Sequence, residues 1–369
     1  MNNSTGDGGH IFNKKIILIG SGWAGSSFLK TIDYDKFEVE VISKNKYFIF
    51  TPLLVRSLFN KINIRYNINK FGKFNFKNYE VKSVDFDKKL VILENSDLKL
   101  DYDYLVLAHG SDINTFNING VKENCHFLNY SNSDNIKKKL DELNDNSNIM
   151  VIGCGLSGSE LIGNLIDQKK FKNIYAIDGL KYPLPQFNQK LRNYTLNLWN
   201  LSNVNTYFGN FVNKIDKNKI YFKNNSLNYD IVFWCGGVKP SKFSMDINKK
   251  LLLNCKYGIP VDDYLKVKNT NNVFAIGDCS FNKLQPTAQV AYQEGKYLAY
   301  NFNNNFNNIN KFKFIDKGKL CYIGNNKSIF ENKYLSIKGT LCNYFNKMIH
   351  IYNGINLDQK IQLFNDLYF

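Results

Sequence analysis

The feature that most constrains the fold is a glycine turn that occurs twice, each time between an apolar run and a helix-like run. The two stretches are "KKIILIGSGWAGSSFLKTI", with Gly20, Gly22 and Gly25, and "SNIMVIGCGLSGSELIGNLI", with Gly153, Gly155 and Gly158. In such a turn the first glycine permits a tight bend, the second lets the backbone approach a pyrophosphate, and the third lets the helix pack on the strand. A single match can be a structural turn, but two complete matches predict an α/β fold with two Rossmann-like dinucleotide-binding domains.

The strand that follows each helix distinguishes the two ligands. "NIYAIDGL" ends in Asp178, where a carboxylate accepts a hydrogen bond from a ribose 2′-hydroxyl and repels a 2′-phosphate. We therefore predict NADH rather than NADPH at the second turn, a preference that the nearby Lys181 weakens. At the first turn the equivalent position is Ser43, followed by Lys44, with no carboxylate. A non-nicotinamide dinucleotide such as FAD fits there, although Ser43 could be only a turn residue.

A later strand-like run, "VFAIGDCS", ends in Gly277 and Asp278. A carboxylate at such a strand end can accept hydrogen bonds from the hydroxyls of a ribityl chain. The alternative is an aspartate that caps a helix or closes a turn.

The next stretch, "LQPTAQVAYQEGKYLAYNF", predicts a helix with Pro286 at its first position. Gln289 and Gln293 lie one helical turn apart on one face, with Lys296 close by. Taken alone, paired glutamines on a helix are most often solvated. A stripe of small residues beside them leaves room for something large, and it consists of Ala288, Ala291, Gly295 and Ala299.

Composition excludes several classes of protein. The net charge of +16 accompanies an abundance of Lys, Asn, Ile, Phe and Tyr throughout the chain, so we attribute it to a compositional bias before a membrane surface or nucleic acid. The seven cysteines form no CxxC pair, and the four histidines have no metal-ligand spacing, so we expect neither a disulfide framework nor a metal site. No apolar stretch is long enough to span a membrane, and no targeting sequence is visible.

The C-terminal residues change in character. "GTLCNYFNKMIHIYNGINLDQKIQLFNDLYF" predicts two amphipathic helices, which either cap the core or a dimer interface or lie in a membrane interface. Before them, the Asn-rich run at 301–314 is interpreted as a surface linker. The apolar residues at helical spacing are Leu341, Tyr344, Phe345, Met348, Ile349 and Tyr352, then Leu357, Ile361, Phe364 and Tyr368.

From about Lys14 to its end, the chain resembles the type II NADH dehydrogenases, which are non-proton-pumping NADH:quinone oxidoreductases. The stretches "YFIFTPLL", "NTFNINGVKEN" and "PTAQVAYQEGKYLA" are more specific to that family than either glycine turn. The other stretches that carry the resemblance are "GSGWAG", "YDYLVLAHGSDINTF", "VIGCGLSGSE", "FAIGDC" and "KGKLCYIG".

The resemblance implies a flavoprotein oxidoreductase of the respiratory chain that is attached peripherally to a membrane. Its expected parts are a discontinuous FAD-binding domain (12–144 and 250–312), an NADH-binding domain (145–249) and a C-terminal membrane-anchoring region (313–369). Expected partners are a quinone, an anionic membrane surface and a second copy in a homodimer, with no nucleic acid. The expected location is the mitochondrial inner membrane, or the cytoplasmic membrane if the protein is bacterial.

The resemblance also implies roles for residues at matching positions. Glu160, Gln289, Gln293 and Lys317 would serve catalysis, the two glutamines lying between the flavin and the quinone. FAD would contact Gly20, Ser21, Gly22, Trp23, Ala24, Gly25, Ser43, Lys44, Thr51, Pro52, Gly110, Gly277, Asp278, Ala288 and Gln289. NADH would contact Gly153, Gly155, Leu156, Ser157, Gly158, Glu160, Asp178, Gly236 and Gly237.

Several alternatives stay open from the sequence. Gly236 and Gly237 could form only a turn, and Glu160 could be a first-turn carboxylate favoured by the helix dipole rather than a group that positions NADH or relays protons. A sulfide:quinone or disulfide reductase would share the fold but needs paired redox cysteines. A flavoprotein of the apoptosis-inducing type would instead use the positive charge to bind nucleic acid. The chain shows no calcium-binding insert, and its C-terminal end is shorter than in many mitochondrial relatives.

Overall fold

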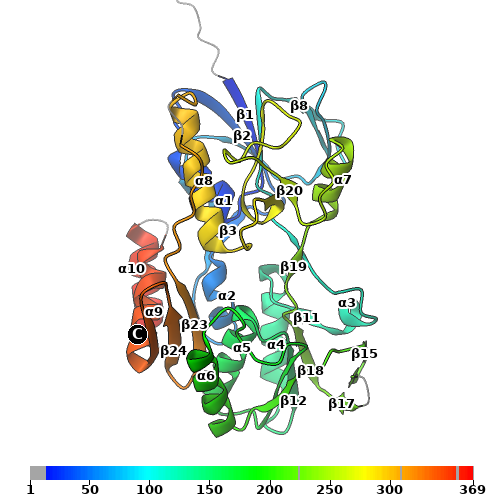
Figure 1. The fold of residues 1–369 in the computed structure, drawn as a ribbon, viewed down its shortest axis with the longest axis vertical. Helices are drawn as coiled ribbons and strands as arrows, with labels where there is room; N and C mark the ends of the chain where they lie inside the picture. Colours follow the sequence, from blue (N-terminus) through cyan, green and yellow to red (C-terminus); the bar gives the residue numbers. More distant parts are fainter. Residues whose placement is uncertain (1–13, 223–224, 308–309, 355–356, 369) are drawn as a thin grey trace, which may run out of the picture. The chain divides into compact units, whose positions relative to one another are not determined.

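The structure is a computed structural model, and it describes residues 14–222, 225–307, 310–354 and 357–368. The chain divides into two compact units, and each is assembled from three separate segments (Figure 1). The first unit comprises Met1–Phe48, Tyr66–Asp112 and Lys239–Phe314, and the second comprises Ile49–Arg65, Ile113–Val238 and Ile315–Phe369. The chain crosses between units five times. Four crossings fall within short strands, namely β3 (Tyr47–Ile49), β4 (Arg65–Asn67), β10 (Asp112–Ile113) and β19 (Val238–Lys239), and the fifth falls in the loop at residues 314–315.

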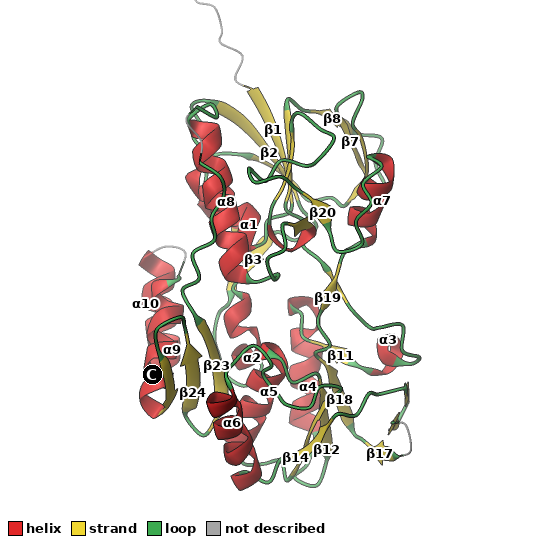
Figure 2. Ribbon diagram, viewed as in Figure 1, coloured by secondary structure: helices red, strands yellow, loops and turns green. Residues whose placement is uncertain are grey.

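Each unit contains a five-stranded parallel sheet (Figure 2). The first sheet runs β21 (Val273–Ala275), β9 (Tyr104–Leu107), β1 (Lys14–Ile19), β2 (Phe37–Ile42) and β5 (Asn75–Lys77). The second runs β11 (His126–Phe127), β18 (Ile231–Trp234), β12 (Asn148–Ile152), β13 (Asn173–Asp178) and β14 (Asn205–Phe208). Four adjacent strands follow the same chain order in both sheets, namely β9-β1-β2-β5 in the first and β18-β12-β13-β14 in the second.

This strand order fixes where ligands can bind. In the first sheet the chain runs from β1 outwards to β2 and β5 and then returns to β9 on the other side of β1. In the second sheet it runs from β12 to β13 and β14 and then returns to β18 on the other side of β12. Ligands of such sheets bind at the carboxyl ends of the strands at this switch point. The middle of β1 is apolar because both faces of the sheet are covered there; Ile16, Ile17 and Leu18 are completely buried. The predicted pair of Rossmann-like domains is therefore confirmed as a fold.

Helices follow the glycine turns as the sequence predicts. The main helices of the first unit are α1 (Trp23–Thr31), α7 (Lys242–Lys250) and α8 (Ala288–Asn303). Those of the second unit are α2 (Leu54–Ser57), α3 (Val121–Asn124), α4 (Ser133–Glu142), α5 (Leu156–Asp167) and α6 (Gln189–Leu201).

Small sheets and short helices complete the two units. The first unit contains β6 (Val81–Asp85), β7 (Leu90–Leu93), β8 (Lys99–Asp101), β20 (Ile259–Pro260), β22 (Ser280–Phe281), and the 3-10 helices at Ile68–Phe71 and Gly277–Cys279. The second unit contains β15 (Lys214–Asp216), β16 (Lys219–Tyr221), β17 (Ser226–Asn228), and the 3-10 helices at Thr51–Leu53 and Tyr130–Asn132. Strands β20 and β22 pair in parallel, and the other strands of this group pair antiparallel.

Two expectations about α8 are wrong at its ends. The helix begins at Ala288 rather than at Pro286, because the Thr287 hydroxyl accepts a hydrogen bond from the Val290 N–H at 3.2 Å and caps the first turn. The expected linker at 301–314 begins too early, since α8 continues to Asn303. Phe302 is completely buried and packs its ring edge to face against Phe28, so helical burial overrides the Asn-rich composition there.

The C-terminal segment consists of an antiparallel sheet and the two expected helices. Its elements are β23 (Lys319–Gly324), β24 (Lys327–Glu331), β25 (Ser336–Gly339), α9 (Thr340–Tyr352) and α10 (Leu357–Tyr368). The side chains of Leu357 and Tyr368 fall outside what the structure describes. Within the described ranges, no helix combines the length and apolar character that crossing a membrane requires.

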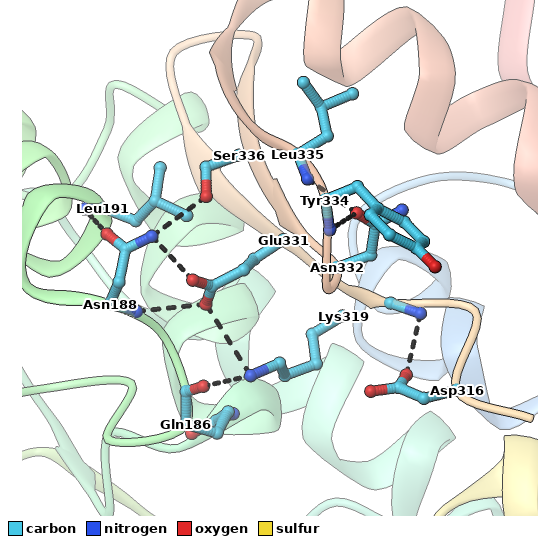
Figure 3. A network of polar contacts seen from close by, with 11 residues as sticks. Gln186, Asn188, Leu191, Asp316, Lys319, Glu331, Asn332, Tyr334, Leu335 and Ser336 are labelled. Atoms are coloured by element: carbon cyan, nitrogen blue, oxygen red, sulfur yellow. Dashed lines mark hydrogen bonds and ion pairs between the residues drawn. The ribbon is translucent and has the colours of Figure 1, made fainter. Parts of the chain in front are cut away.

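A polar network joins this C-terminal sheet to the start of α6 (Figure 3). The Glu331 carboxylate accepts hydrogen bonds from the backbone N–H and side-chain amide of Asn188, at 3.0 and 2.6 Å. Lys319 lies 3.6 Å from the same carboxylate and also donates to the Gln186 carbonyl. Because Asn188 in turn caps α6 through the Leu191 N–H, the C-terminal sheet is attached to the sheet of its own unit.

Candidate functional site

The first glycine turn lies at the carboxyl end of β1. A Cβ atom added to Gly20 would lie 2.3 Å from the Ala108 carbonyl oxygen, and one added to Gly25 would lie 2.1 Å from the Gly20 oxygen. Both glycines are therefore required by packing. By contrast, a Cβ on Gly22 would meet nothing within 4 Å, so the backbone there faces open space at the start of α1. This is the arrangement that admits a pyrophosphate.

The second turn repeats this geometry at the carboxyl end of β12. A Cβ on Gly153 would lie 2.4 Å from the Cys235 oxygen, and one on Gly158 would lie 1.9 Å from the Gly153 oxygen. Gly155 again faces open space, and Leu156 and the exposed Ser157 begin α5 directly after it. The two sites are thus built alike, one in each unit.

Around the first turn, Ser43 is more than a loop residue. Its hydroxyl accepts hydrogen bonds from the Ser21 hydroxyl at 2.9 Å and from the Asn45 N–H at 3.2 Å. It therefore joins the glycine turn to the end of β2. Lys44, next along the chain, is exposed and lies 3.2 Å from the Glu80 carboxylate.

Asp278 stands in the 3-10 turn that follows β21, in the same unit as the first glycine turn. The Ser111 hydroxyl donates to its Oδ2 at 3.3 Å, and burial raises the pKa of the Asp278 carboxyl. Gly110 beside Ser111 has φ +76° and faces open space. Next to it, the buried Nε2 of His109 has no hydrogen-bond partner among the described residues, and burial lowers the pKa of His109 to about 4. Acceptors at Asp278 and open backbone at Gly22 and Gly110 fit a ligand with ribityl hydroxyls and a pyrophosphate.

Sequence analysis missed Glu294, a completely buried residue of α8. Its carboxylate accepts hydrogen bonds from the Gly277 N–H at 2.5 Å and from the Asn282 amide at 2.6 Å. Burial raises the pKa of Glu294 to about 7. Glu294 falls on the same buried helical face as Ala291 and Leu298, but the sequence does not show the Gly277 N–H that the buried carboxylate meets. We infer that Glu294 fixes the turn that carries Asp278.

The small-residue stripe of α8 was expected to leave room for something large, but at Gly295 its neighbour is helix α1. A Cβ on Gly295 would lie 2.1 Å from the Ala24 oxygen, so Gly295 lets α8 approach helix α1 rather than a ligand. Ala24 of the expected FAD set is itself buried in this contact. Trp23 packs edge to face against Phe48. Ala288, Gln289 and Gln293 are partly exposed on the same helix.

Asp178 lies where the sequence predicts, at the end of β13 beside the second glycine turn. Its Oδ2 accepts from the Cys154 N–H at 2.6 Å, and its Oδ1 accepts from the Leu180 N–H at 2.8 Å. Each carboxylate oxygen has two lone pairs, so both can still accept a ribose hydroxyl.

Gly236 and Gly237 follow β18 and form a well-held turn. The Asn114 N–H donates to the Gly237 oxygen at 2.9 Å, and the Trp234 ring N–H donates to the Asn114 oxygen at 2.8 Å. A Cβ on Gly236 would lie 2.7 Å from the Trp234 ring nitrogen, so packing alone requires this glycine. A role beside the nicotinamide stays a prediction.

Glu160 lines a cavity of about 20 Å³ inside the second unit. The cavity is large enough for a single water molecule. Desolvation raises the pKa of Glu160 to about 8, whereas stabilisation by a helix dipole would lower it. Glu160 is also the fifth residue of α5, whose first turn holds no acidic residue, so the alternative interpretation as a first-turn carboxylate is wrong. Among the residues that line the cavity with it are Pro52, Arg56, Asn164, Tyr322, Asn346 and His350.

The polar groups of this cavity lie on several elements. The Asn346 side-chain oxygen is buried without a hydrogen-bond partner among the described residues. His350 of α9 has its pKa lowered to about 4 by burial and then by the Arg56 charge. Thr51 and Pro52 begin the 3-10 helix that precedes α2 in this unit. Lys317 also belongs to this unit, in the loop before β23 where the Gly318 N–H donates to Asp316 (Figure 3).

Cysteines and metals add no further chemistry. The seven cysteines are free, and burial raises the pKa of the Cys154 and Cys235 thiols beside the second turn, which makes them poor redox nucleophiles. Within the described residues, no group of His, Cys, Asp and Glu side chains could hold a metal ion.

Comparisons with known proteins give one consistent result. Residues 14–295 match the pyridine nucleotide-disulphide oxidoreductase family. A probable mitochondrial NADH-ubiquinone oxidoreductase of Schizosaccharomyces pombe is 26% identical, over 92% of this chain and 78% of its own length. The mitochondrial internal alternative NAD(P)H-ubiquinone oxidoreductase A1 of Arabidopsis thaliana is 30% identical, over 78% and 67%. The structure of NDH2 from Plasmodium falciparum in complex with NADH superposes with a TM-score of 0.89 at 25% identity, covering 96% of this chain and 97% of that one.

Proposed function

This chain belongs to the type II NADH dehydrogenases of the pyridine nucleotide-disulphide oxidoreductase family, and we propose that it oxidises NADH and reduces a quinone without pumping protons. When bound, FAD accepts a hydride from NADH and passes two electrons to the quinone. The observation that carries the proposal is the pair of alike glycine turns, of which only the second is followed by a strand-end carboxylate, Asp178.

We propose that the first turn holds FAD. The open backbone at Gly22 and Gly110 leaves room for the pyrophosphate, and Asp278 offers acceptors to ribityl hydroxyls. Ser43 would orient the turn from the end of β2. Gln289 would border the flavin, and Thr51 and Pro52 are proposed from family resemblance alone.

The second turn would hold NADH. The N–H groups at Gly155, Leu156 and Ser157 begin α5 and can bind the pyrophosphate, while Asp178 accepts the ribose hydroxyl. The Gly236–Gly237 turn would border the nicotinamide. The ligand-based division into an FAD domain (12–144 and 250–312), an NADH domain (145–249) and a C-terminal region (313–369) stays part of this proposal. It differs from the compact units, because residues 49–65 and 113–144 pack with the second unit and residues 239–249 pack with the first.

For the quinone step we propose that Glu160 stores and delivers a proton. With a pKa of about 8 it is protonated at neutral pH, and its cavity can hold a water molecule for transfer. Gln289 and Gln293 would orient the quinone carbonyl through neutral amide donors. Lys317 would contribute a positive charge beside the reduced quinone.

We further propose that α9 and α10 dock on an anionic membrane. Helix α9 buries polar residues, since the Asn343 oxygen and the Asn346 amide both bond the buried Ser328 hydroxyl. Most of its large apolar side chains are left exposed, whereas Ile349, which was expected to contact the membrane, is partly buried. The exposed apolar side chains of the two helices are Leu341, Tyr344, Phe345, Met348, Tyr352, Ile361 and Phe364. A helix that exposes its apolar face fits an interfacial helix better than one that caps a core.

Relatives that are named as mitochondrial support a mitochondrial location, and we propose that the protein lies on the inner membrane. We also propose that it forms a homodimer there. The exposed apolar residues of α9 and α10 are available to a bilayer or to a second copy.

The test of the function is spectroscopic. Purified protein should be yellow, bleach anaerobically with NADH and recolour when a short-chain quinone is added. Failure to bleach would refute NADH oxidation, and failure to recolour would refute quinone reduction. Steeply salt-dependent binding to DNA, with negligible quinone reduction, would instead favour a nucleic-acid-binding flavoprotein.

A further inference from the structure

Two exposed apolar side chains stand beside Asp178. Leu180, two residues further along the chain, is 50% exposed, and Phe211, after β14, is 72% exposed. A Cβ added to Gly179 would lie 2.3 Å from a ring carbon of Phe211, so the ring edge rests directly against the Gly179 backbone. The Phe211 ring is therefore held in place although most of its surface is open.

The loops that carry these residues are joined by backbone hydrogen bonds. The Gly209 N–H donates to the Leu180 oxygen at 2.9 Å, and the Asn210 N–H donates to the Asp178 oxygen at 3.1 Å. These bonds continue the parallel pairing of β13 with β14 beyond the strand ends. All of these groups lie in the second unit, so their placement relative to the second glycine turn is fixed.

Core packing does not account for Phe211. The next residue, Val212, is the one that enters the core and anchors the loop. Exposing a large aromatic ring at the carboxyl edge of a Rossmann-like sheet leaves an apolar surface beside the carboxylate that would hold a ribose.

We propose that Phe211 and Leu180 form the surface on which the adenine ring of NADH lies. This inference rests on the proposed binding of NADH at Asp178. The adenine is bonded to the ribose that Asp178 would hold, so it must lie within one ring width of that carboxylate. A flat aromatic base gains most from a flat aromatic face that is already fixed, and Gly179 leaves space for the Phe211 ring because it has no side chain.

The test compares two nicotinamide hydride donors, one with adenine and one without. In Phe211→Ala we expect the KM for NADH to rise roughly tenfold with little change in kcat, in line with the loss of one base stack. Flavin reduction by reduced nicotinamide mononucleotide, which lacks adenine, should be unchanged. Phe211→Tyr should restore the KM for NADH. Leu201→Ala is the matched control, because Leu201 is an 87% exposed apolar residue of the same unit.

A binding measurement independent of activity completes the test. The fluorescence of ethenoadenosine diphosphate ribose should be quenched on binding to the wild-type protein and to Phe211→Tyr, and not to Phe211→Leu, which keeps apolar surface but no ring. Equal quenching by Phe211→Leu, or an equal loss of activity with both nicotinamide donors in Phe211→Ala, would overturn the proposal. If NADH fails to reduce the wild-type flavin, the proposed oxidation of NADH is refuted. The fluorescence measurement alone then decides whether Phe211 binds the adenine ring.

Discussion

The Asp178 carboxylate accepts a hydrogen bond from the backbone N–H of Cys154, with 2.6 Å between Oδ2 and the nitrogen. The residue that would select the ribose therefore also braces the glycine turn that would hold the pyrophosphate. Asp178→Ala should lower kcat/KM for NADH by roughly tenfold to a hundredfold, because a hydrogen bond to a charged group is lost. Steady-state kinetics with both nucleotides measures this.

The wild-type protein should prefer NADH over NADPH because Asp178 repels a 2′-phosphate. Lys181→Ala should strengthen this preference, because the nearby Lys181 is the positive charge that weakens it. Equal efficiency of the wild type with both nucleotides would contradict this role of Asp178.

Glu160 should give quinone reduction a characteristic pH dependence. With its pKa raised to about 8, the carboxyl carries a proton below that pH and loses it above, so flavin reoxidation should slow as the pH rises through about 8. Glu160→Gln should slow reoxidation on the order of a hundredfold and remove this dependence. Stopped-flow traces across the pH range measure both effects. A wild-type reoxidation rate that stays flat through this range would exclude Glu160 as the proton source.

Gln289 and Gln293 should act on one half-reaction only. Replacing either by Ala removes a hydrogen bond to an uncharged group, worth about 1 kcal/mol, so quinone efficiency should fall several-fold. Flavin reduction by NADH should be nearly unchanged. Lys296→Ala, on the exposed side of the same helix, is the matched control. If stopped-flow data show that only the NADH half slows, or that neither half changes, the two glutamines are solvated or structural.

Membrane docking should depend on the exposed face of α9. Phe345→Ser with Met348→Ser should weaken co-sedimentation with anionic vesicles roughly a hundredfold, because two apolar side chains lose their burial in the bilayer. Both side chains are more than half exposed, so the fold should be retained. Leu201→Ser is the control, because it removes an exposed apolar side chain outside α9 and should leave sedimentation unchanged. Truncation after Lys338 should also abolish sedimentation while FAD stays bound, but it uncovers Ser328 and is the less specific experiment. Undiminished sedimentation of the double variant would mean that this face serves another contact.

Glu294 should make stability depend on pH. Its folded pKa of about 7 lies above the ordinary value of 4.5, so the native state holds a proton that the unfolded chain has released. Its contribution is complete below about pH 4.5 and is lost as the pH rises through about 7, on the order of 3 kcal/mol. Denaturant titrations at about pH 5 and about pH 8 should show this loss in the wild type and not in Glu294→Gln. The same loss in Glu294→Gln would assign it to another group, and Glu80→Gln controls for an exposed carboxylate.

Features that depend on local pattern could be predicted from the sequence. The strands before Gly20 and Gly153 are continuous apolar runs, and the tight bends need glycine, so both Rossmann-like halves follow from short stretches. Asp178 was found because its position in the βαβ unit is fixed by the helix and strand before it.

Features that depend on distant partners could not be predicted. Asn343 and Asn346 are polar, and only the Ser328 hydroxyl on β24 explains why α9 turns them inward. Glu294 is buried because the Gly277 N–H meets it, and a helical pattern cannot show that meeting. The position of the Phe211 ring likewise depends on Gly179, more than thirty residues earlier in the chain, because a side chain there would occupy the space of the ring.

The interleaving of the two units has a consequence for synthesis on the ribosome. The first parallel sheet lacks an edge strand until Val273–Ala275 has been made, and the second unit still awaits its segment Ile315–Phe369 after that. Contacts between such distant segments form slowly because long loops must close. During much of its elongation the nascent chain therefore carries a first sheet without its last strand and then a second unit without its C-terminal segment, and its yield in a cell depends on what shields the apolar surfaces until the final segments emerge.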